Sequence, residues 1–82
     1  MQRTILLADL PIGQKATIHQ ITGSGPMYER LFDLGFTPGS SVSCLFPSLF
    51  GDPRAYRIKQ TIIALRQADA AGVECFADGG EP

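Results

Sequence analysis

The residues able to support covalent chemistry are few and widely separated in this sequence. There is one histidine, His19, and there are two cysteines, Cys44 and Cys75. Acyl transfer needs a nucleophile, a base within hydrogen-bond reach and an oxyanion site, and no Gly-x-Ser-x-Gly motif is present. Alternating hydrophobicity places both cysteines inward on strands, where a thiol is usually an inert small hydrophobe. We therefore expect the protein not to be an enzyme and to require no cofactor.

A stretch of positive charge is the second chemical feature. No acidic residue lies between Asp52 and Asp69, and the cations in this interval are Arg54, Arg57, Lys59 and Arg66. The simpler interpretation is a solvated strand face. The functional interpretation is a surface that guides an acidic partner toward the protein. Because the chain has seven Lys and Arg against eight Asp and Glu, a net charge of −1, we do not expect a general nucleic-acid or membrane-surface binder.

The segment "LFPSLFGDPRAY", residues 45–56, combines turn-forming residues with large hydrophobic ones. Leu49 and Phe50 lie among Pro47, Gly51 and Asp52, so a surface loop would expose two apolar side chains. Two interpretations are equally open. The pair is either a docking tip for another protein, beside the basic stretch, or a plug that folds back and fills one end of a small barrel.

The composition favours one small domain built from short elements. The chain has 82 residues with nine glycines and six prolines, which favours many short strands over a few long helices. Two cysteines are too few for a disulfide framework, so a reduced cytosolic protein is the simpler expectation. The apolar run from Ile5 to Ala8 ends at Asp9 and is too short for a signal peptide. No stretch approaches the ~20 apolar residues of a membrane-spanning helix, so we expect a cytoplasmic protein outside the membrane.

Alternating apolar positions predict five short strands. The inward residues are, in chain order, Ala16 and Ile18, then Val42, Cys44 and Phe46, then Tyr56 and Ile58, then Ile63 and Leu65, and finally Val73 and Cys75. His19 falls on the outward face of the first strand, and the segment "QADAAG" predicts a tight helical turn before the last one. Strands this short cannot shield two faces, so we predict an all-β fold in which they close into a small barrel.

One short α-helix is predicted after the first strand, over residues 26–34. Pro26 suits its first position because the missing N–H would have no partner there. Gly35 suits the left-handed C-cap. The predicted apolar stripe consists of Met27, Tyr28, Leu31, Phe32 and Leu34. A turn at "FTPG" follows, and the predicted domain spans residues 1–76, with residues 77–82 as a frayed tail.

The order of these segments resembles the FeoA family of bacterial ferrous-iron transport proteins. The resemblance rests on "LADLPIGQKATIHQI", "RLFDLGFTPGSSV", "FGDPRAYRI" and "IALRQADAAGVEC", which together run from Leu7 to Cys75. The structural motif residues that match are Gly35, Pro38, Gly39, Gly51, Asp52 and Pro53. In the family the strand before the Gly-Asp-Pro loop often carries basic residues, whereas this chain has "CLFP". This departure from the family's pattern implies a more apolar partner-facing surface than is usual.

The resemblance implies an SH3-like barrel and a role beside FeoB, a membrane permease with a cytoplasmic GTP-binding domain. We therefore expect a non-enzymatic accessory protein of ferrous-iron uptake that docks on that cytoplasmic part. The residues expected to bind this partner are Leu49, Phe50, Arg54, Arg57 and Lys59. In this interpretation the apolar pair supplies affinity, and the cations mainly speed the encounter.

The iron setting of the family also bears on His19. One chain offers too few converging ligands for a metal site. We expect at most weak binding of a divalent transition metal, iron or zinc, at a site that His19 and nearby carboxylates share between two molecules of a monomer or weak homodimer. A solvated strand residue is the simpler interpretation of His19. Two other functions stay open: a metal-linked regulatory domain like that of iron-dependent repressors, and a small barrel whose nucleic-acid binding weakens with salt.

Overall fold

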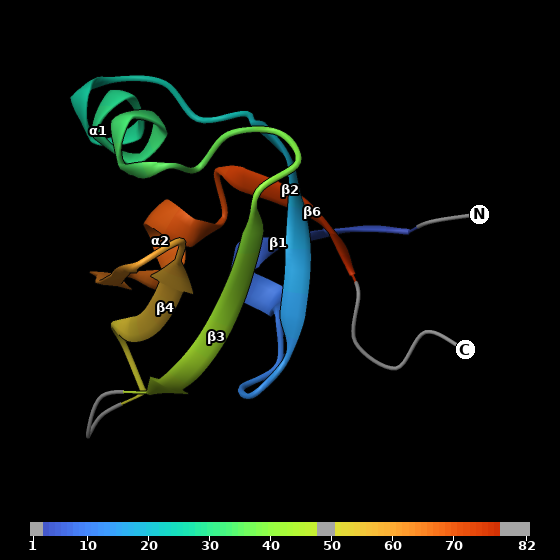
Figure 1. Cartoon of the computed structure of the whole chain (residues 1–82). Helices are drawn as coiled ribbons and strands as arrows, with labels where there is room; N and C mark the ends of the chain where they lie inside the picture. The colour runs from blue at the N-terminus through green and yellow to red at the C-terminus, as the bar shows by residue number, and fades with distance from the viewer. Residues whose placement is uncertain (1–2, 48–50, 78–82) are drawn as a thin grey trace.

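The computed structural model describes residues 3–47 and 51–77, and its strands form one antiparallel sheet with the order β1-β6-β2-β3-β4-β5 (Figure 1). In chain order the elements are β1 (Thr4–Leu6), the 3-10 helix η1 (Leu7–Asp9), β2 (Lys15–Ile21), α1 (Pro26–Leu34), β3 (Ser41–Pro47), β4 (Arg54–Ile58), β5 (Thr61–Leu65), α2 (Gln67–Ala70) and β6 (Val73–Ala77). Figure 1 shows β2 and β3 side by side, with α1 at one end of the pair. The predicted all-β class is confirmed.

One strand of this sheet escaped the sequence pattern. The five predicted strands are β2 to β6, and the structure adds β1, so α1 follows the second strand rather than the first. In β1, Ile5 lies opposite Cys75 of β6, at the other end of the chain. Three residues are too few for a visible alternation, and a partner so distant in sequence gives no local signal. Strand β6 also extends to Ala77, the first residue of the predicted tail. Ala77 pairs with Ala16 of β2.

Helix α1 forms where it was predicted but contacts the core along a narrower line. Gly35 ends it with a left-handed φ of 116°, and the Gly35 N–H donates to carbonyl oxygens of the last turn. Of the predicted stripe, Leu31 is fully buried, whereas Met27 and Phe32 are 42% and 54% exposed. A nine-residue helix at the end of a sheet meets it only on one edge, so the flanks of the stripe face solvent.

The core confirms most of the predicted inward positions. The buried residues come from both ends of the chain and from every strand but β1: Leu7, Leu10, Ala16, Ile18, Leu31, Phe36, Val42, Cys44, Tyr56, Ile58, Leu65, Ala70, Val73 and Cys75. Ile63 is only partly buried against this core, and Phe46 is the exception, at 57% exposed. The register of β3 against β4 shifts between Cys44 and Phe46, and such a bulge reverses the alternation beyond it. The prediction of an inward Phe46 is therefore wrong.

A tight hairpin joins β4 to β5. Ile58 pairs with Thr61, which leaves Lys59 and Gln60 as the two-residue loop. Lys59 adopts a positive φ of 53°, the only such non-glycine residue in the part of the chain that is described. Loops of this length favour glycine at such positions because it has no Cβ, or asparagine because its short polar side chain can hydrogen-bond locally. The hairpin therefore holds a lysine in an unusual backbone conformation.

Candidate functional site

His19 faces outward from β2, as predicted, with a side chain that is 40% exposed. Its Nε2 lies 3.7 Å from Oε1 of Glu74 on the neighbouring strand β6, and its ring centroid lies 4.5 Å from that of Phe76. Glu74 also accepts a hydrogen bond of 2.8 Å from the side chain of Gln20. Across residues 3–47 and 51–77, no group of three His, Cys, Asp or Glu side chains is placed to hold a metal ion. The pair of His19 and Glu74 supplies two donors, which is half of a tetrahedral shell.

Neither Cys44 nor Cys75 forms a disulfide, and both are buried, as predicted. Burial raises the pKa of the Cys44 thiol, and the nearby Arg54 guanidinium opposes that rise without cancelling it. Since the thiolate is the reactive form, a raised pKa makes Cys44 a poor nucleophile at neutral pH. Cys44 and Cys75 therefore act as core residues.

Arg54 lies at the start of β4 and directs its guanidinium into the fold. Nη1 donates to the carbonyl of Leu10 at 3.0 Å, and Nη2 donates to that of Ala8 at 2.7 Å. Nη2 also donates to the hydroxyl of Tyr56 at 2.8 Å, and the guanidinium carbon lies 5.5 Å from the centre of that ring. These contacts join β4, next to one edge of the sheet, to η1, which directly follows the opposite edge strand. The donors of Arg54 therefore stabilise the fold, and its contribution to partner binding stays a prediction.

Arg57 and Lys59 have the opposite orientation and are exposed. They border a hollow of about 240 Å³ whose lining residues are Ser40, Ser41, Ser43, Arg57 and Lys59. A second hollow, of about 330 Å³, is lined by Arg57, Lys59, Gln60 and Ile62. The three serines were not singled out by the sequence reasoning. The pattern Ser41-Val42-Ser43 around a buried valine does place two hydroxyls on the outward face of β3.

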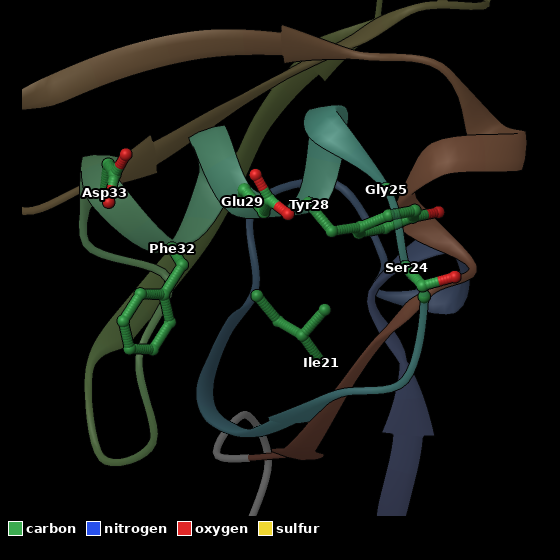
Figure 2. Close-up of a pocket in the computed structure, with 8 residues that line it drawn as sticks. Ile21, Ser24, Gly25, Tyr28, Glu29, Phe32 and Asp33 are labelled. Atoms are coloured by element: carbon green, nitrogen blue, oxygen red, sulfur yellow. The ribbon is translucent and has the colours of Figure 1, made fainter.

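A larger groove of about 550 Å³ lies between α1 and the end of β2 (Figure 2). Figure 2 shows Ile21 below the helix, with Tyr28 and Phe32 on either side of it and the carboxylates of Glu29 and Asp33 along the helix. The groove is thus apolar at its base, with acidic side chains beside it. Phe32, which lines this groove, is 54% exposed, and Phe46 of β3 is 57% exposed.

The glycines beside this groove have a packing role that the sequence did not reveal. A side chain at Gly23 or Gly72 would overlap the ring of Tyr28, whose hydroxyl donates to the carbonyl of Asp69 at 3.0 Å. Both glycines leave room for an aromatic ring that ties α1 to α2.

The matching motif residues form turns and a helix cap. Gly35, Gly39 and Gly51 all have positive φ. The carboxylate of Asp52 accepts a hydrogen bond of 2.9 Å from the backbone N–H of Gln67, the first residue of α2. An acceptor at a helix N-terminus satisfies a donor that the helix itself leaves free. Leu49 and Phe50 lie outside the described residues, so their role as a docking tip or a barrel plug stays a prediction.

Comparisons with known proteins give a consistent result. The model of the FeoA domain matches residues 5–75. The chain is 32% identical over 68 residues to the Fe(2+) transport protein A/Fe(2+) transporter FeoB fusion protein of Porphyromonas gingivalis; this alignment covers 83% of the chain but only 8% of that protein. None of the helices within the described ranges is long and apolar enough to cross a membrane.

Two solved structures share the fold at an informative level of identity. Iron(II) transport protein A from Clostridium thermocellum is 32% identical, with a TM-score of 0.83, over 93% of this chain and 47% of that one. FeoA from Stenotrophomonas maltophilia, solved with zinc and described as a prokaryotic SH3 domain protein, is 26% identical, with a TM-score of 0.76, over 95% of this chain and 89% of that one. The SH3-like fold implied by the sequence motifs is therefore confirmed.

Proposed function

The chain belongs to the FeoA domain family of ferrous-iron transport, and from that premise we propose that it is a non-enzymatic accessory protein that docks on the cytoplasmic part of a FeoB-type transporter. The observation that carries the proposal is the relative in which a protein of this family and the transporter form one polypeptide. Two domains in one chain are held at a high local concentration of each other, which suits domains that work in contact.

The proposed docking surface lies on the outward face of β3 and β4. Phe46 is 57% exposed at the end of β3 that leads to Leu49 and Phe50. Burying an exposed phenylalanine in a partner contributes about 1.5–3 kcal/mol before ordering costs. Arg57 and Lys59 lie further along the same face and would speed the approach of an acidic partner. Apolar affinity at one end and steering charge at the other suit a transient protein contact.

The test is a binding assay with the cytoplasmic GTP-binding domain of the transporter, using Phe46→Ser and the matched control Phe32→Ser. Both side chains are phenylalanines of similar exposure, 57% and 54%, on different faces. We expect Phe46→Ser to weaken binding at least tenfold and Phe32→Ser to leave it within about twofold. The reverse result would move the docking surface to the groove beside α1. If the wild-type chain binds no transporter fragment, the docking proposal is wrong.

A second candidate function is weak transition-metal binding, which the approach of His19 to Glu74 favours. The relative from Stenotrophomonas maltophilia was solved as a complex with zinc. In this chain His19 and Glu74 lie on adjacent strands with their side chains 3.7 Å apart and on the protein surface. A second copy presenting the same pair would complete four ligands of the types that zinc accepts. The proposed site therefore forms between two molecules.

If the metal site is shared between two molecules, zinc binding should be accompanied by an increase in molecular mass from monomer to dimer. Zinc titration followed by light scattering should give dimers in the wild type and monomers in His19→Ala. Because histidine contributes a good zinc ligand, the substitution should reduce affinity by about tenfold or more. Tight binding of one zinc per monomer, or binding that is unchanged in His19→Ala, would exclude a shared site at this position.

A further inference from the structure

The hollow between β3 and the β4–β5 hairpin has an unusual lining. Its side chains are those of Ser40, Ser41, Ser43, Arg57 and Lys59, and it measures about 240 Å³. Each of these side chains is a hydrogen-bond donor, two of them carry a fixed positive charge, and none is acidic. We call this hollow the serine–cation pocket. Its chemistry suits an anion with several oxygen atoms.

Strand register arranges the donors in two parallel rows. Ser43 lies directly opposite Arg57, and the ladder ends at the next pair, Val42 and Ile58, beyond which Ser41 and Lys59 also line the pocket. Residues two apart on a strand share a face, and directly opposed side chains have Cβ atoms about 4.5–5.5 Å apart. A row of hydroxyls on β3 therefore runs beside a row of cations that begins on β4. An anion above this ladder would contact both rows at once.

These donors have free capacity within the protein. Among the described residues, the side chains of Arg57, Lys59, Ser41 and Ser43 make no hydrogen bond or ion pair. The hydroxyl of Ser40 is shared with that of Thr37 at 3.0 Å. A guanidinium that remains without a partner keeps its five N–H donors available for a ligand. These donors are therefore accessible to a ligand from outside the fold.

The backbone at Lys59 adds an independent observation. Its positive φ of 53° lies in a region that residues with a Cβ adopt at a cost, and such outliers cluster at binding and active sites. A Cβ at Gly35 would lie 3.1 Å from both Cδ and Cε of Lys59. The absence of a side chain at Gly35 thus leaves room for the lysine stem. The hairpin and the helix end together hold Lys59 beside the pocket.

We propose that the serine–cation pocket binds the phosphate group of a small phosphate ester. A phosphate monoester carries about −1.5 to −2 charges at neutral pH, which matches one arginine and one lysine. A carboxylate carries one charge and two oxygens, so it would leave one cation and several donors unused. Charge-assisted hydrogen bonds from a guanidinium to phosphate are also among the strongest in proteins. Charge and donor count together favour phosphate over carboxylate.

The neighbouring hollow indicates what the rest of the ester contacts. It is lined by Arg57, Lys59, Gln60 and Ile62 and measures about 330 Å³. Ile62 lies opposite Arg57 in the ladder and is 56% exposed. An apolar or aromatic group attached to the phosphate would lie over this isoleucine. The pocket therefore binds an ester with an apolar group more tightly than inorganic phosphate.

The test is an NMR titration of the isotopically labelled chain with inorganic phosphate, phenyl phosphate and benzoate at constant ionic strength. We expect phenyl phosphate to bind most tightly and to shift the amides of residues 40–43 and 57–62. Arg57→Gln and Lys59→Met should each weaken its binding about tenfold or more, because each removes a charged donor. Arg30→Gln, which removes an exposed cation from α1, should change it less than about twofold. Ile62→Ser should reduce the affinity for phenyl phosphate to that for inorganic phosphate.

Three results would overturn the proposal. Benzoate could shift the same amides with equal affinity, which would make the pocket a carboxylate site. Arg30→Gln could weaken binding as much as Arg57→Gln, which would reduce the effect to the general field of the protein. Phosphate could also produce no saturable shift in the pocket. The spectra themselves report whether each variant is folded. The titration uses this chain alone, so its outcome is independent of whether the chain docks on a transporter.

Discussion

The two ends of strand β4 use the same residue type in opposite ways. Arg54 donates to the carbonyls of Ala8 and Leu10 and to the hydroxyl of Tyr56, all within the fold. Arg57, three positions later, is exposed and makes no hydrogen bond or ion pair within the described residues. The first arginine holds two ends of the sheet together, and the second is available to a ligand or partner.

Strand parity explains the difference. Side chains alternate between faces, so Arg54 shares the inward face with Tyr56 and Ile58, whereas Arg57 and Lys59 face outward. Alternation places Arg54 inward together with Tyr56 and Ile58, whereas the run of positive charge groups it with the outward cations. The basic stretch therefore contains two sets of cations: Arg54, which is directed into the fold, and the exposed pair Arg57 and Lys59. Charge alone did not distinguish them, and the alternation pattern does.

The largest expected effect comes from removing the inward arginine. Arg54→Met keeps a long apolar stem but leaves the carbonyls of Ala8 and Leu10 without their donors. Hydrogen bonds to charged groups contribute about 1.5–3 kcal/mol each, and Arg54 is only half-buried, so we expect a loss of about 2–3 kcal/mol. Urea unfolding measures it. Arg57→Gln should change stability by less than about 0.5 kcal/mol. Equal losses of stability in Arg54→Met and Arg57→Gln would contradict the inference that Arg54 faces inward and Arg57 outward.

Gly35→Ala should give the next largest effect. Gly35 has a φ of 116°, and an added Cβ would lie 3.1 Å from the Lys59 side chain. Forcing an alanine into this conformation costs about 1–3 kcal/mol. Gly39→Ala is the matched control, because Gly39 has a φ of 92° and no atom within 4 Å of its added Cβ. We expect Gly35→Ala to lower the free energy of unfolding more than Gly39→Ala does. This excess should disappear when Lys59 is also replaced by alanine, as measured by a double-mutant cycle. If the excess persists after that replacement, it arises from the backbone conformation or burial of Gly35 rather than from its contact with Lys59.

The sequence predicted what local rules determine and missed what depends on distant strands. Pro26 and Gly35 bound α1 as expected, because caps are read from neighbouring residues. Phe46 faced the wrong way, because a bulge depends on the partner strand. Strand β1 was missed for the same reason, since its partner β6 is at the other end of the chain.

The candidate site followed the same division. His19 was correctly placed outward by alternation, but its neighbour Glu74 comes from β6 and could be identified only through strand pairing. The alternation Ser41-Val42-Ser43 is typical of an outward row of hydroxyls, but this row was not identified from the sequence. Its position beside Arg57 and Lys59 could not be predicted, because that needs the register of β3 against β4. Residue types indicate what chemistry is available, and register determines which residues meet.

Alkaline pH should destabilise the protein through the buried groups Cys44 and Tyr56 that lie near Arg54. Burial raises the pKa of Cys44 above its ordinary 9.0 and that of Tyr56 above its ordinary 10.0, against the opposing effect of Arg54. The folded protein thus keeps these protons to higher pH than the unfolded chain does. Their stabilisation is complete below about pH 9 and is lost as the pH rises through the folded-state values. Urea unfolding between pH 7 and 11 measures the loss.

A matched variant tests whether these buried groups cause the loss. Tyr56→Phe removes the phenol, so its stability should fall less steeply between pH 10 and 11 than that of the wild type. Its stability at neutral pH should be lower, because the hydroxyl accepts from Arg54 and donates to the carbonyl of Leu7 at 3.4 Å. Parallel curves for the two proteins at high pH would assign the alkaline loss to other groups.

The smallest expected effect concerns the rate at which the outward cations guide a partner. Replacing both Arg57 and Lys59 by glutamine should slow association with the transporter fragment a few-fold at low salt, because exposed charges act on the encounter rather than on the bound state. The dissociation rate should stay nearly constant, in contrast to Phe46→Ser, which removes a side chain that is 57% exposed and should speed dissociation. At an ionic strength of about 1 M the Debye length is ~3 Å, so the wild type and the charge variant should then associate at the same rate. A difference in association rate that persists at high salt would mean that Arg57 or Lys59 is buried against the partner. These residues would then form part of the binding interface rather than only guide the approach.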